Sequence, residues 1–320
     1  MKKISIIIPC KTLKEAEKCI YKCLELQYPN FEIIILTDQI DQQNMFNNNI
    51  KVRIINTGPV NPSIKRNIGV ANSTGEIIAF IDSDAYPEQN WLNTASKWFD
   101  SDNHILVGGP DIVPPDSNIM QRLVGYILGS YSCGGTFAIR QGTKKYKEIQ
   151  EIGSCNMFIR KEDFVKANGF NPDYNINEDS EFCFRIKKMD MKIIFDPSLF
   201  VWHRKRNLFI PHLKRIFIYG YYKPKILLKH FSIEKLFYTI PSLLIFCFIF
   251  SIFIPVLRIP IFLYLGFVIL ESIYKNILFS PIIMLGIIST VIVYGVAFVL
   301  GAINELFITY KINKESHLEI

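Results

Sequence analysis

The sequence predicts an α/β domain with a mixed, mostly parallel sheet, followed by C-terminal transmembrane helices. Short apolar runs alternate with amphipathic helical patterns through residues 1–204, which is typical of a sheet covered by helices on both faces. Two long stretches without charge, 236–257 and 276–304, are suited to a bilayer. A cluster of Lys and Arg lies directly before the first of them, as in proteins that enter a membrane from the cytoplasm.

The elements of the α/β domain follow from the period of the apolar positions. Continuous apolar runs predict buried strands, and apolar positions repeated every three or four residues predict helices. The predicted strands are residues 4–9, 31–36, 52–55, 76–81 and 105–107. The predicted helices are residues 12–26, 63–71 and 87–99, the last beginning at Pro87. Because ligands bind beyond the carboxyl ends of the strands in such sheets, we expect functional residues directly after strands.

The charge of the chain is concentrated in one segment. Residues 201–235 hold nine Lys and Arg against one Glu, whereas residues 1–200 have a net charge of −1 and residues 236–320 of 0. Nucleic-acid binding requires a basic face on the folded domain, so no nucleic-acid partner is expected. The basic segment, residues 205–235, has the composition of an amphipathic interfacial helix in contact with membrane lipids. It also predicts that the residues before the spans are cytoplasmic.

The membrane region predicts a multi-pass protein of the cell membrane. Its first span, 236–257, would be about 33 Å long as a helix, which exceeds a bilayer core of about 30 Å. Residues 281–303 form a second apolar span. Residues 259–274 have a shorter apolar run that ends before Glu271, so they form either a third span or a buried or re-entrant helix. The chain is thus divided into an α/β domain, the basic segment, a membrane region and a tail: residues 1–204, 205–235, 236–304 and 305–320.

Two carboxylates follow the predicted strand 76–81. Asp82 and Asp84 are separated by a single residue and stand at the edge of the sheet. Two like charges this close need a partner, and a hard divalent cation, Mg2+ or Mn2+, supplies one and also neutralises a diphosphate. The alternative is a solvated turn in which an Asp caps the helix that begins at Pro87.

The residues around this pair resemble the core signature of family 2 glycosyltransferases, which have the Rossmann-like, nucleotide-sugar-binding GT-A fold. The stretch from Lys65 to Glu76 follows the family pattern R-N-x-G-x3-A-x-G, and the strand and the D-x-D pair come next. The pattern A-x-P-x3-W-L then ends at Leu92. The resemblance covers residues 3–204, so the domain 1–204 is expected to be catalytic. It implies a nucleotide diphosphate sugar as donor, a UDP-sugar first, together with Mn2+ or Mg2+.

The resemblance also implies donor-binding residues. The loop at Pro9 and Lys11 is expected to touch the nucleotide, although Pro9-Cys10-Lys11-Thr12 departs from the family pattern P-x-[YR]-N. Strand 31–36 ends in Leu36-Thr37-Asp38 where the family has V-D-D or V-D-N, so Asp38 is expected to contact the base, or else is a turn residue. Arg66 is expected near the phosphates. Asp82 is expected near the ribose or a metal-bound water, and Asp84 on the metal.

Two further segments resemble family landmarks. Glu178 and Asp179 match the E-D pair of the pattern E-D-x-E-L-x-x-R, in which the Asp is the catalytic base and the Glu lies beside the donor. Taken locally, the pair is an acidic start to a helix, where carboxylates are common stabilisers. His203 matches the D-P…V-x-H ending of many relatives and is expected as a third metal ligand, which Mn2+ accepts better than Mg2+. The alternative is a structural or interfacial histidine.

Together these features predict an inverting, metal-dependent glycosyltransferase at the cytoplasmic face of the membrane. The acceptor would be a hydroxyl or phosphate, lipid-linked or on a glycan, in polysaccharide or glycolipid synthesis. The motif Q-x-x-R-W of processive synthases does not occur here, which argues against polymer synthesis. A nucleotidyltransferase is a weaker alternative. Such an enzyme typically has a Gly-rich loop after its first strand, and residues 9–12, which stand at that place, contain no glycine. A non-catalytic membrane subunit with a decayed transferase domain is favoured only by the departures at Lys11 and Thr37.

Overall fold

The computed structural model describes residues 1–39, 46, 49–101, 104–142 and 145–316. These residues form two compact units. The first unit is Met1–Asp116 with Ile139–Arg204, and the second is Ser117–Ala138 with Lys205–Ile320. No pattern in the sequence predicts that residues 117–138 belong with the C-terminal part of the chain. Of the predicted tail 305–320, the last four residues, 317–320, lie outside the described residues.

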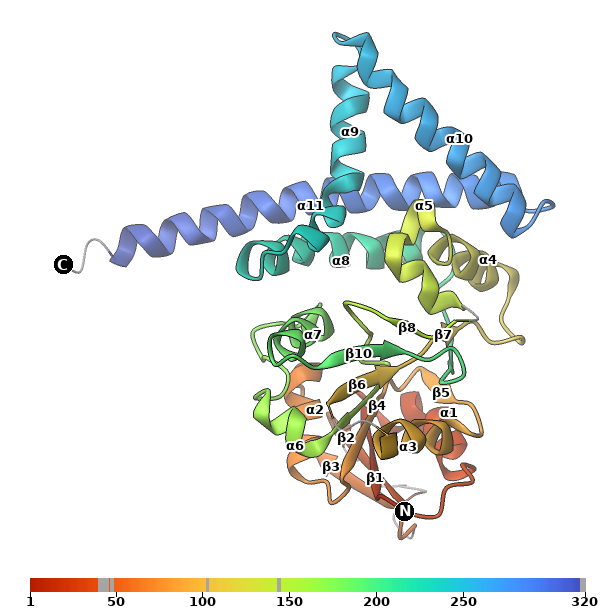
Figure 1. The fold of residues 1–320 in the computed structure, drawn as a ribbon, viewed down its shortest axis with the longest axis vertical. Coiled ribbons are helices and arrows are strands. Elements are labelled where there is room, and N and C mark those ends of the chain that lie inside the picture. Colours follow the sequence, from red (N-terminus) through yellow and green to blue (C-terminus); the bar gives the residue numbers. More distant parts are fainter. Residues whose placement is uncertain (40–45, 47–48, 102–103, 143–144, 317–320) are drawn as a thin grey trace. The chain divides into compact units, whose positions relative to one another are not determined.

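Among the described residues, an eight-stranded sheet forms the centre of the first unit, in the order β3-β2-β1-β4-β9-β6-β10-β8 (Figure 1). The strands β1 to β4 pair in parallel, as do β6 and β10, whereas β9 runs antiparallel to both β4 and β6. The predicted mixed, mostly parallel sheet is confirmed. The strands are β1 Ile4–Pro9, β2 Phe31–Thr37, β3 Val52–Asn56, β4 Ile77–Ile81, β6 Ile105–Gly108, β8 Lys147–Glu148, β9 Asn156–Arg160 and β10 Lys192–Phe195.

Helices cover both faces of this sheet because successive side chains of a strand point to opposite sides. Ile6 and Ile8 of β1 pack in the core under α1 and α3, whereas Ile7 packs in the core under α2, α6 and α7. The predicted strands and helices between residues 4 and 81 form with ends shifted by a few residues. The helices are α1 Leu13–Leu24, α2 Pro62–Ala71, α3 Trp91–Ser101, α6 Lys161–Lys166 and α7 Glu178–Lys188.

The prediction of a helix that begins at Pro87 is wrong. Pro87 ends the short strand β5 (Ala85–Pro87), and α3 begins four residues later at Trp91. The strand β5 lies at the edge of a small three-stranded sheet, where proline is tolerated because its missing N–H is not needed on the open side.

This small sheet joins three distant segments in the order β5-β11-β7. The strand β11 (Val201–His203) pairs antiparallel with β5, so that His203 lies opposite Ala85. It also pairs in parallel with β7 (Asp111–Ile112), with Val201 opposite Asp111. The pairing therefore brings the end of the D-x-D motif, Asp111 and His203 into one place.

Asn156 connects the two sheets through its buried amide. Its Nδ2 donates to the carbonyls of Leu199 (2.6 Å) and Pro110 (3.0 Å), and its Oδ1 accepts from the Trp91 indole N–H (2.9 Å). The side chain is 1% exposed, so water cannot replace these partners.

We expect Asn156→Leu to destabilise the first unit strongly. The change leaves the Trp91 N–H and two carbonyls buried without partners, at about 1–3 kcal/mol each, so the midpoint of thermal unfolding should fall by about 6 °C or more, at about 2–4 °C per kcal/mol. Circular dichroism of the full chain in detergent measures the shift. Asn93→Leu is the control, because that amide makes one exposed bond, to Gln27 O. Equal shifts in the two variants would show that the buried hydrogen bonds of Asn156 stabilise the unit no more than the exposed bond of Asn93 does.

The second unit holds three described helical segments that are long and apolar enough to cross a membrane. These are Ile233–Phe250, Pro255–Lys275 and Ser280–Ile308. The first ends earlier than the predicted 236–257, because Pro255 cannot continue a helix and disfavours helical backbone in the residue before it. The helices and 3-10 segments of this part of the chain are α4 Ile119–Leu128, α5 Tyr131–Gly134, η1 Gly135–Gln141, α8 Ile210–Lys229, η2 Ile233–Thr239, α9 Ile240–Phe250, η3 Pro255–Leu257, α10 Arg258–Lys275 and α11 Ser280–Ser316.

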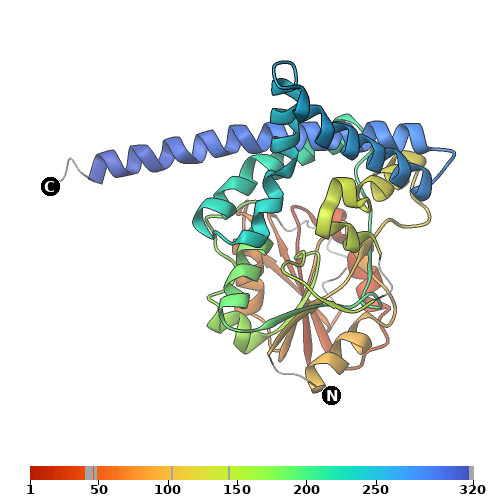
Figure 2. The same cartoon turned by 45° about the horizontal axis from the view of Figure 1, so that its top comes forward.

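Most of the basic segment forms α8, which lies alongside α11 (Figures 1 and 2). Glycines permit the close approach: a Cβ at Gly301 would overlap the backbone of Tyr221, and one at Gly220 would press on the carbonyl of Tyr294. The outer side of α8 exposes Lys214, Lys229 and several aromatic side chains, as an interfacial helix would. Three lysines of the basic segment, Lys205, Lys223 and Lys235, are buried in the structure. Lys223 lies over the ring of Tyr238.

Glu271 of α10 is the acidic residue that follows the apolar run 259–270, and hydrogen bonds hold its carboxylate. Its carboxylate accepts from the backbone N–H groups of Tyr131 (2.6 Å) and Ser132 (2.9 Å) and from the Ser132 hydroxyl (2.6 Å). A buried carboxylate is tolerated when hydrogen bonds replace its hydration. These bonds fasten the segment 117–138 to α10 within the second unit.

Candidate active site

The ends of β1 and β2 form one connected loop region in the first unit. The Asp38 N–H and the Thr37 hydroxyl both donate to the carbonyl of Lys11, at 3.1 and 3.0 Å. Asp38 also forms an ion pair with Lys65 of α2, whose buried ammonium donates in addition to the carbonyl of Cys10. Lys65 stands in the segment that resembles the family motif, but the motif itself implies no role for it. The structure thus places Lys11 and Asp38 together beside Pro9, with the ammonium group of Lys65 next to Asp38.

Arg66 joins the two acidic motifs. Its guanidinium donates to Asp82 Oδ1 at 2.7 Å and to Glu178 Oε1 at 2.8 Å, although Glu178 lies 112 residues further along the chain. The Arg66 side chain is 3% exposed. Burial opposes its charge, but the carboxylates of Asp82, Glu178 and Asp179 outweigh burial and raise the pKa of Arg66 above its usual value. A permanently cationic group therefore lies between the D-x-D motif and the E-D pair.

The two members of the E-D pair have different surroundings. Glu178 is buried, bonded to Arg66 and 3.4 Å from the Ser154 hydroxyl, whereas Asp179 is half-exposed and, within the described residues, accepts a hydrogen bond from the Ser180 N–H. Burial raises the pKa of Glu178 to about 7; the charge of Arg66 opposes this shift, and the charges of Asp179 and Asp82 add to it. Glu178 is thus held in place, and the Asp179 carboxylate remains partly accessible.

The raised pKa of Glu178 predicts that the difference in stability between wild type and Glu178→Gln depends on pH. Between pH 4.5, its ordinary pKa, and about 7, the folded state holds a proton that the unfolded state has released. The stability that Glu178 contributes therefore falls as pH rises through this window and is constant above it. Compared with wild type, Glu178→Gln should gain in thermal midpoint from pH 5 to pH 7 and then keep a constant difference. Scans of both proteins from pH 5 to 8 measure this, and a difference independent of pH would contradict the raised pKa.

Asp84 and His203 lie together at the end of the small sheet. Nε2 of His203 is 3.3 Å from Asp84 Oδ1, and the Asp84 side chain is 63% exposed. Asp82, two residues earlier, turns its carboxylate to Arg66. A carboxylate oxygen and an imidazole nitrogen beside open solvent form a donor set that fits Mn2+, and Mg2+ less well because of the nitrogen. The predicted metal ligands Asp84 and His203 are therefore adjacent, whereas the carboxylate of the third predicted ligand, Asp82, is bound to Arg66.

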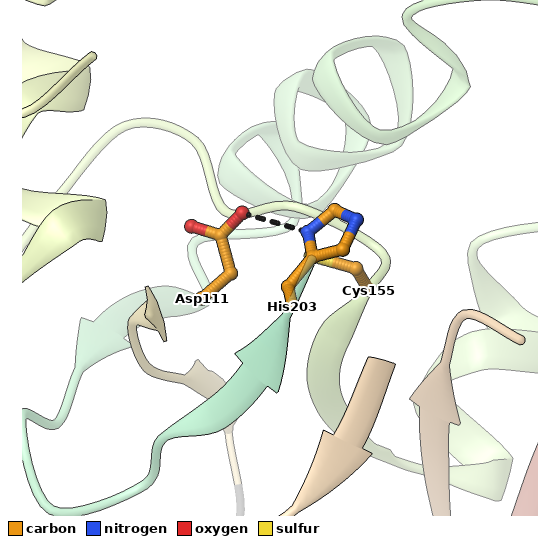
Figure 3. Close-up of side chains that lie close together, drawn as sticks. All are labelled: Asp111, Cys155 and His203. Atoms are coloured by element: carbon orange, nitrogen blue, oxygen red, sulfur yellow. Dashed lines mark hydrogen bonds and ion pairs between the residues drawn. The ribbon is translucent and has the colours of Figure 1, made fainter. Parts of the chain in front are cut away.

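The other side of His203 faces residues that sequence reasoning missed (Figure 3). Nδ1 of His203 is 3.2 Å from Asp111 Oδ2. The Sγ of Cys155 lies in the same group, and one potential ligand atom from each of the three residues lies within 4.8 Å of the others. The signal for Asp111 was present in the sequence, because an acidic residue shortly after the strand 105–107 satisfies the same rule that singled out Asp82.

Two solved structures resemble this fold. A mannosyltransferase from Pyrobaculum calidifontis, solved with GDP-Man and Mn2+, has a TM-score of 0.52 at 16% identity, over 71% of this chain and 64% of that one. GalNAc-T7, solved with UDP, GalNAc and Mn2+, has a TM-score of 0.51 at 14% identity, over 74% and 53%. These likenesses confirm the predicted GT-A fold.

Relatives at the sequence level are glycosyltransferases. A dolichyl N-acetyl-alpha-D-glucosaminyl phosphate 3-beta-D-2,3-diacetamido-2,3-dideoxy-beta-D-glucuronosyltransferase from Methanococcus voltae is 26% identical over 287 residues, which are 81% of this chain and 88% of that protein. The pre-mycofactocin glycosyltransferase of Mycobacterium tuberculosis is 24% identical over 161 residues, and the alignment spans only 33% of that protein's length.

Family models match both parts of the site. The model described as glycosyl transferase family 2 matches residues 5–164, which include the D-x-D motif. The model described as the N-terminal domain of galactosyltransferase matches residues 135–205, which include the E-D pair and His203. The predicted enzyme class, a glycosyltransferase, is confirmed by this agreement of family, relatives and fold. The chain belongs to glycosyl transferase family 2.

Proposed function

We propose that this chain is an inverting, metal-dependent glycosyltransferase that moves a sugar from a nucleoside diphosphate sugar to a lipid-linked hydroxyl or phosphate acceptor. The supporting observation is the position of Arg66, which binds Asp82 of the D-x-D motif and Glu178 of the E-D pair through one guanidinium. Donor-binding and proton-accepting groups are thereby held at one site in the catalytic domain, residues 1–204.

The donor nucleotide would bind at the carboxyl ends of β1 and β2. Pro9, Lys11 and Asp38 would contact the base and ribose there, with Lys65 keeping the Asp38 carboxylate in place. Arg66 would lie near the diphosphate. Its Nε and the Nδ2 of Asn177 are buried N–H donors with no partner among the described residues, and such donors are satisfied by a ligand oxygen or a water. UDP is the first nucleotide to test.

Asp84 and His203 would hold the divalent cation, with Asp82 beside it. When bound, a divalent cation supplies positive charge that stabilises the departing nucleoside diphosphate. Mn2+ is expected to support activity better than Mg2+, because imidazole nitrogen suits Mn2+ better.

Asp179 would be the catalytic base. Its accessible carboxylate takes the proton from the acceptor hydroxyl while that oxygen forms a bond to the anomeric carbon of the sugar. The bond from the anomeric carbon to the diphosphate oxygen breaks on the opposite side, and the configuration inverts. A positioned base of this kind contributes about 10²–10⁴-fold to the rate. Glu178 is unsuited to this role because its carboxylate is bound to Arg66.

A lipid-linked acceptor follows from the rest of the chain. The first candidate span, Ile233–Phe250, begins at the end of the basic segment, whose exposed lysines and aromatic side chains suit the cytoplasmic interface. The relative from Methanococcus voltae, whose name specifies a dolichyl phosphate-linked sugar, aligns over 81% of this chain. We place residues 205–235 at the interface and residues 236–304 in the membrane, with the catalytic domain cytoplasmic.

Membranes that contain the full chain, incubated with Mn2+ and radiolabelled UDP- and GDP-sugars, test this proposal. The expected result is label in the lipid extract, lost with EDTA, with the anomeric configuration of the donor inverted in the product. In a parallel incubation with added pyrophosphate, conversion of the label to sugar 1-phosphate with formation of the nucleoside triphosphate would indicate a nucleotidyltransferase instead. Consumption of no nucleotide sugar in the panel would favour a non-catalytic membrane subunit.

A further inference from the structure

We propose that Asp111 is a positioning residue that fixes the tautomer of His203. In this arrangement Asp111 accepts the Nδ1–H of the imidazole, and the unprotonated Nε2 is presented beside Asp84. The proposal rests on the metal site of the proposed function, because the tautomer matters for a histidine that must offer Nε2 to a cation.

His203 lies between two carboxylates of unequal burial, of which Figure 3 shows Asp111. Asp111 is 3.2 Å from Nδ1 and its side chain is 6% exposed, whereas Asp84 is 3.3 Å from Nε2 and its side chain is 63% exposed. A neutral imidazole has a single N–H. A buried carboxylate without that donor would lose more than an exposed one, which water can satisfy. The N–H therefore belongs on Nδ1. Metal-bound histidines commonly donate their other ring N–H to a carboxylate in this way.

Asp111 is itself held in one orientation by a neighbouring segment. Gln141 Nε2 donates to Asp111 Oδ1 at 3.2 Å, and Arg140 Nε lies 3.6 Å from the same oxygen. Both donors therefore take Oδ1, and Oδ2 is left toward His203. The backbone just before Asp111 packs closely on the segment before β11. A Cβ at Gly109 would overlap the carbonyls of Leu199 and Asp196 there, so only glycine permits this approach.

The cluster of Asp111, Cys155 and His203 is better explained as this positioning network than as a second metal site. Arg140 donates to Cys155 Sγ at 3.4 Å and lies beside Asp111, so positive charge is already present in the cluster. A divalent cation placed there would be repelled by the guanidinium. Gly153 leaves the space for Arg140, because a Cβ at that position would overlap the guanidinium.

Asp111→Asn tests the tautomer assignment directly, because the neighbouring hydrogen-bond donors determine how the new amide is oriented. Arg140 and Gln141 are donors, so the amide oxygen must face them and the amide NH2 must face His203. Nδ1 then becomes the acceptor and Nε2 carries the proton, which blocks it as a ligand. We expect the Kd for Mn2+, measured by electron paramagnetic resonance on the full chain with UDP, to rise by about 10–100-fold.

Asp196→Asn is the matched control. Asp196 is also buried, and its carboxylate accepts hydrogen bonds from Trp98 and Ser198 rather than from His203. We expect it to lower the unfolding midpoint and leave the Mn2+ affinity unchanged. Absence of Mn2+ binding in wild type would count against the metal in the proposed function. Normal Mn2+ binding by D111N would overturn the role of Asp111. A loss of affinity in Cys155→Ala as large as in D111N would make the cluster itself the metal site and also overturn it.

A second readout needs neither metal nor activity. Nitrogen NMR of the metal-free full chain, labelled with 15N-histidine at a pH where the ring is neutral, reports which ring nitrogen of His203 is protonated. The signal is assigned by its absence in His203→Gln among the five histidines of the chain. Wild type should show Nδ1–H and D111N should show Nε2–H. A wild-type protein with the proton on Nε2 would overturn the proposal even if D111N does not fold.

Discussion

Asp179→Asn is expected to reduce sugar transfer by about 10²–10⁴-fold while donor and Mn2+ binding persist. Asn has the shape of Asp and cannot accept the proton of the acceptor hydroxyl. The Asp179 side chain is half-exposed and bonds to the N–H of the next residue, so the change should leave the Arg66 network and the fold intact. Steady-state transfer rates together with calorimetric titration of UDP and Mn2+ measure the two effects separately.

Two further variants make this result specific. Asp190→Asn changes an exposed aspartate just after the other end of α7, in a left-handed conformation that asparagine also adopts, and should transfer normally. Glu178→Gln tests the other member of the E-D pair. If E178Q has no activity and D179N retains it, the base has been assigned to the wrong carboxylate.

Arg66→Gln is expected to have the largest combined effect on binding and stability. Removing one partner from a buried ion pair costs about 3–5 kcal/mol, and here two carboxylates, Asp82 and Glu178, lose the same cation. Without Arg66 the pKa of Glu178 should rise further, since the guanidinium charge is what lowers it. The loss of stability should therefore be smaller at pH 5, where Glu178 is protonated in the folded state, than at pH 8. UDP affinity should fall together with stability.

Thermal scans at pH 5 and pH 8 and UDP titration test this prediction. Arg53→Gln is the control, because Arg53 makes exposed bonds to Asn72 and lies outside the site. Adding Glu178→Gln to R66Q should restore part of the stability at pH 8, because it removes one of the two unbalanced charges. A wild-type UDP affinity in R66Q would contradict the assignment of Arg66 to the donor phosphates.

The sequence predicted the parts of the molecule that carry local signals. Buried strands such as β1 and β4 are continuous apolar runs, and Asp82 and Asp84 follow directly after one of them. What local signals could not reveal was that Arg66 binds both Asp82 and Glu178, because that contact joins segments 112 residues apart. Family resemblance named Arg66, Glu178 and Asp179 separately, and the fold supplied the connection.

The misses arise from long-range pairing. Strands of two or three residues, such as β5 and β7, have no measurable period, so Pro87 resembled a helix start, and the pairing of β7 with β11 that brings Asp111 to His203 could not be read from the sequence. Residues 117–138 join the second unit through bonds from Glu271, which lies about half the chain away and has no local sequence signature. Lys65 was similarly overlooked, because its role depends on the ends of two strands that meet only in the folded sheet.

We expect a cation held by Asp84 and His203 to meet the nucleoside diphosphate beside Arg66. Pulsed electron paramagnetic resonance of Mn2+ bound to the full chain with UDP, in protein labelled with 15N-histidine, tests this in one spectrum. The same ion should couple to the 31P of UDP and to a histidine nitrogen, and only the nitrogen coupling should disappear in His203→Gln. Mn2+ that couples to 31P without a histidine nitrogen, or UDP that binds without Mn2+, would contradict it.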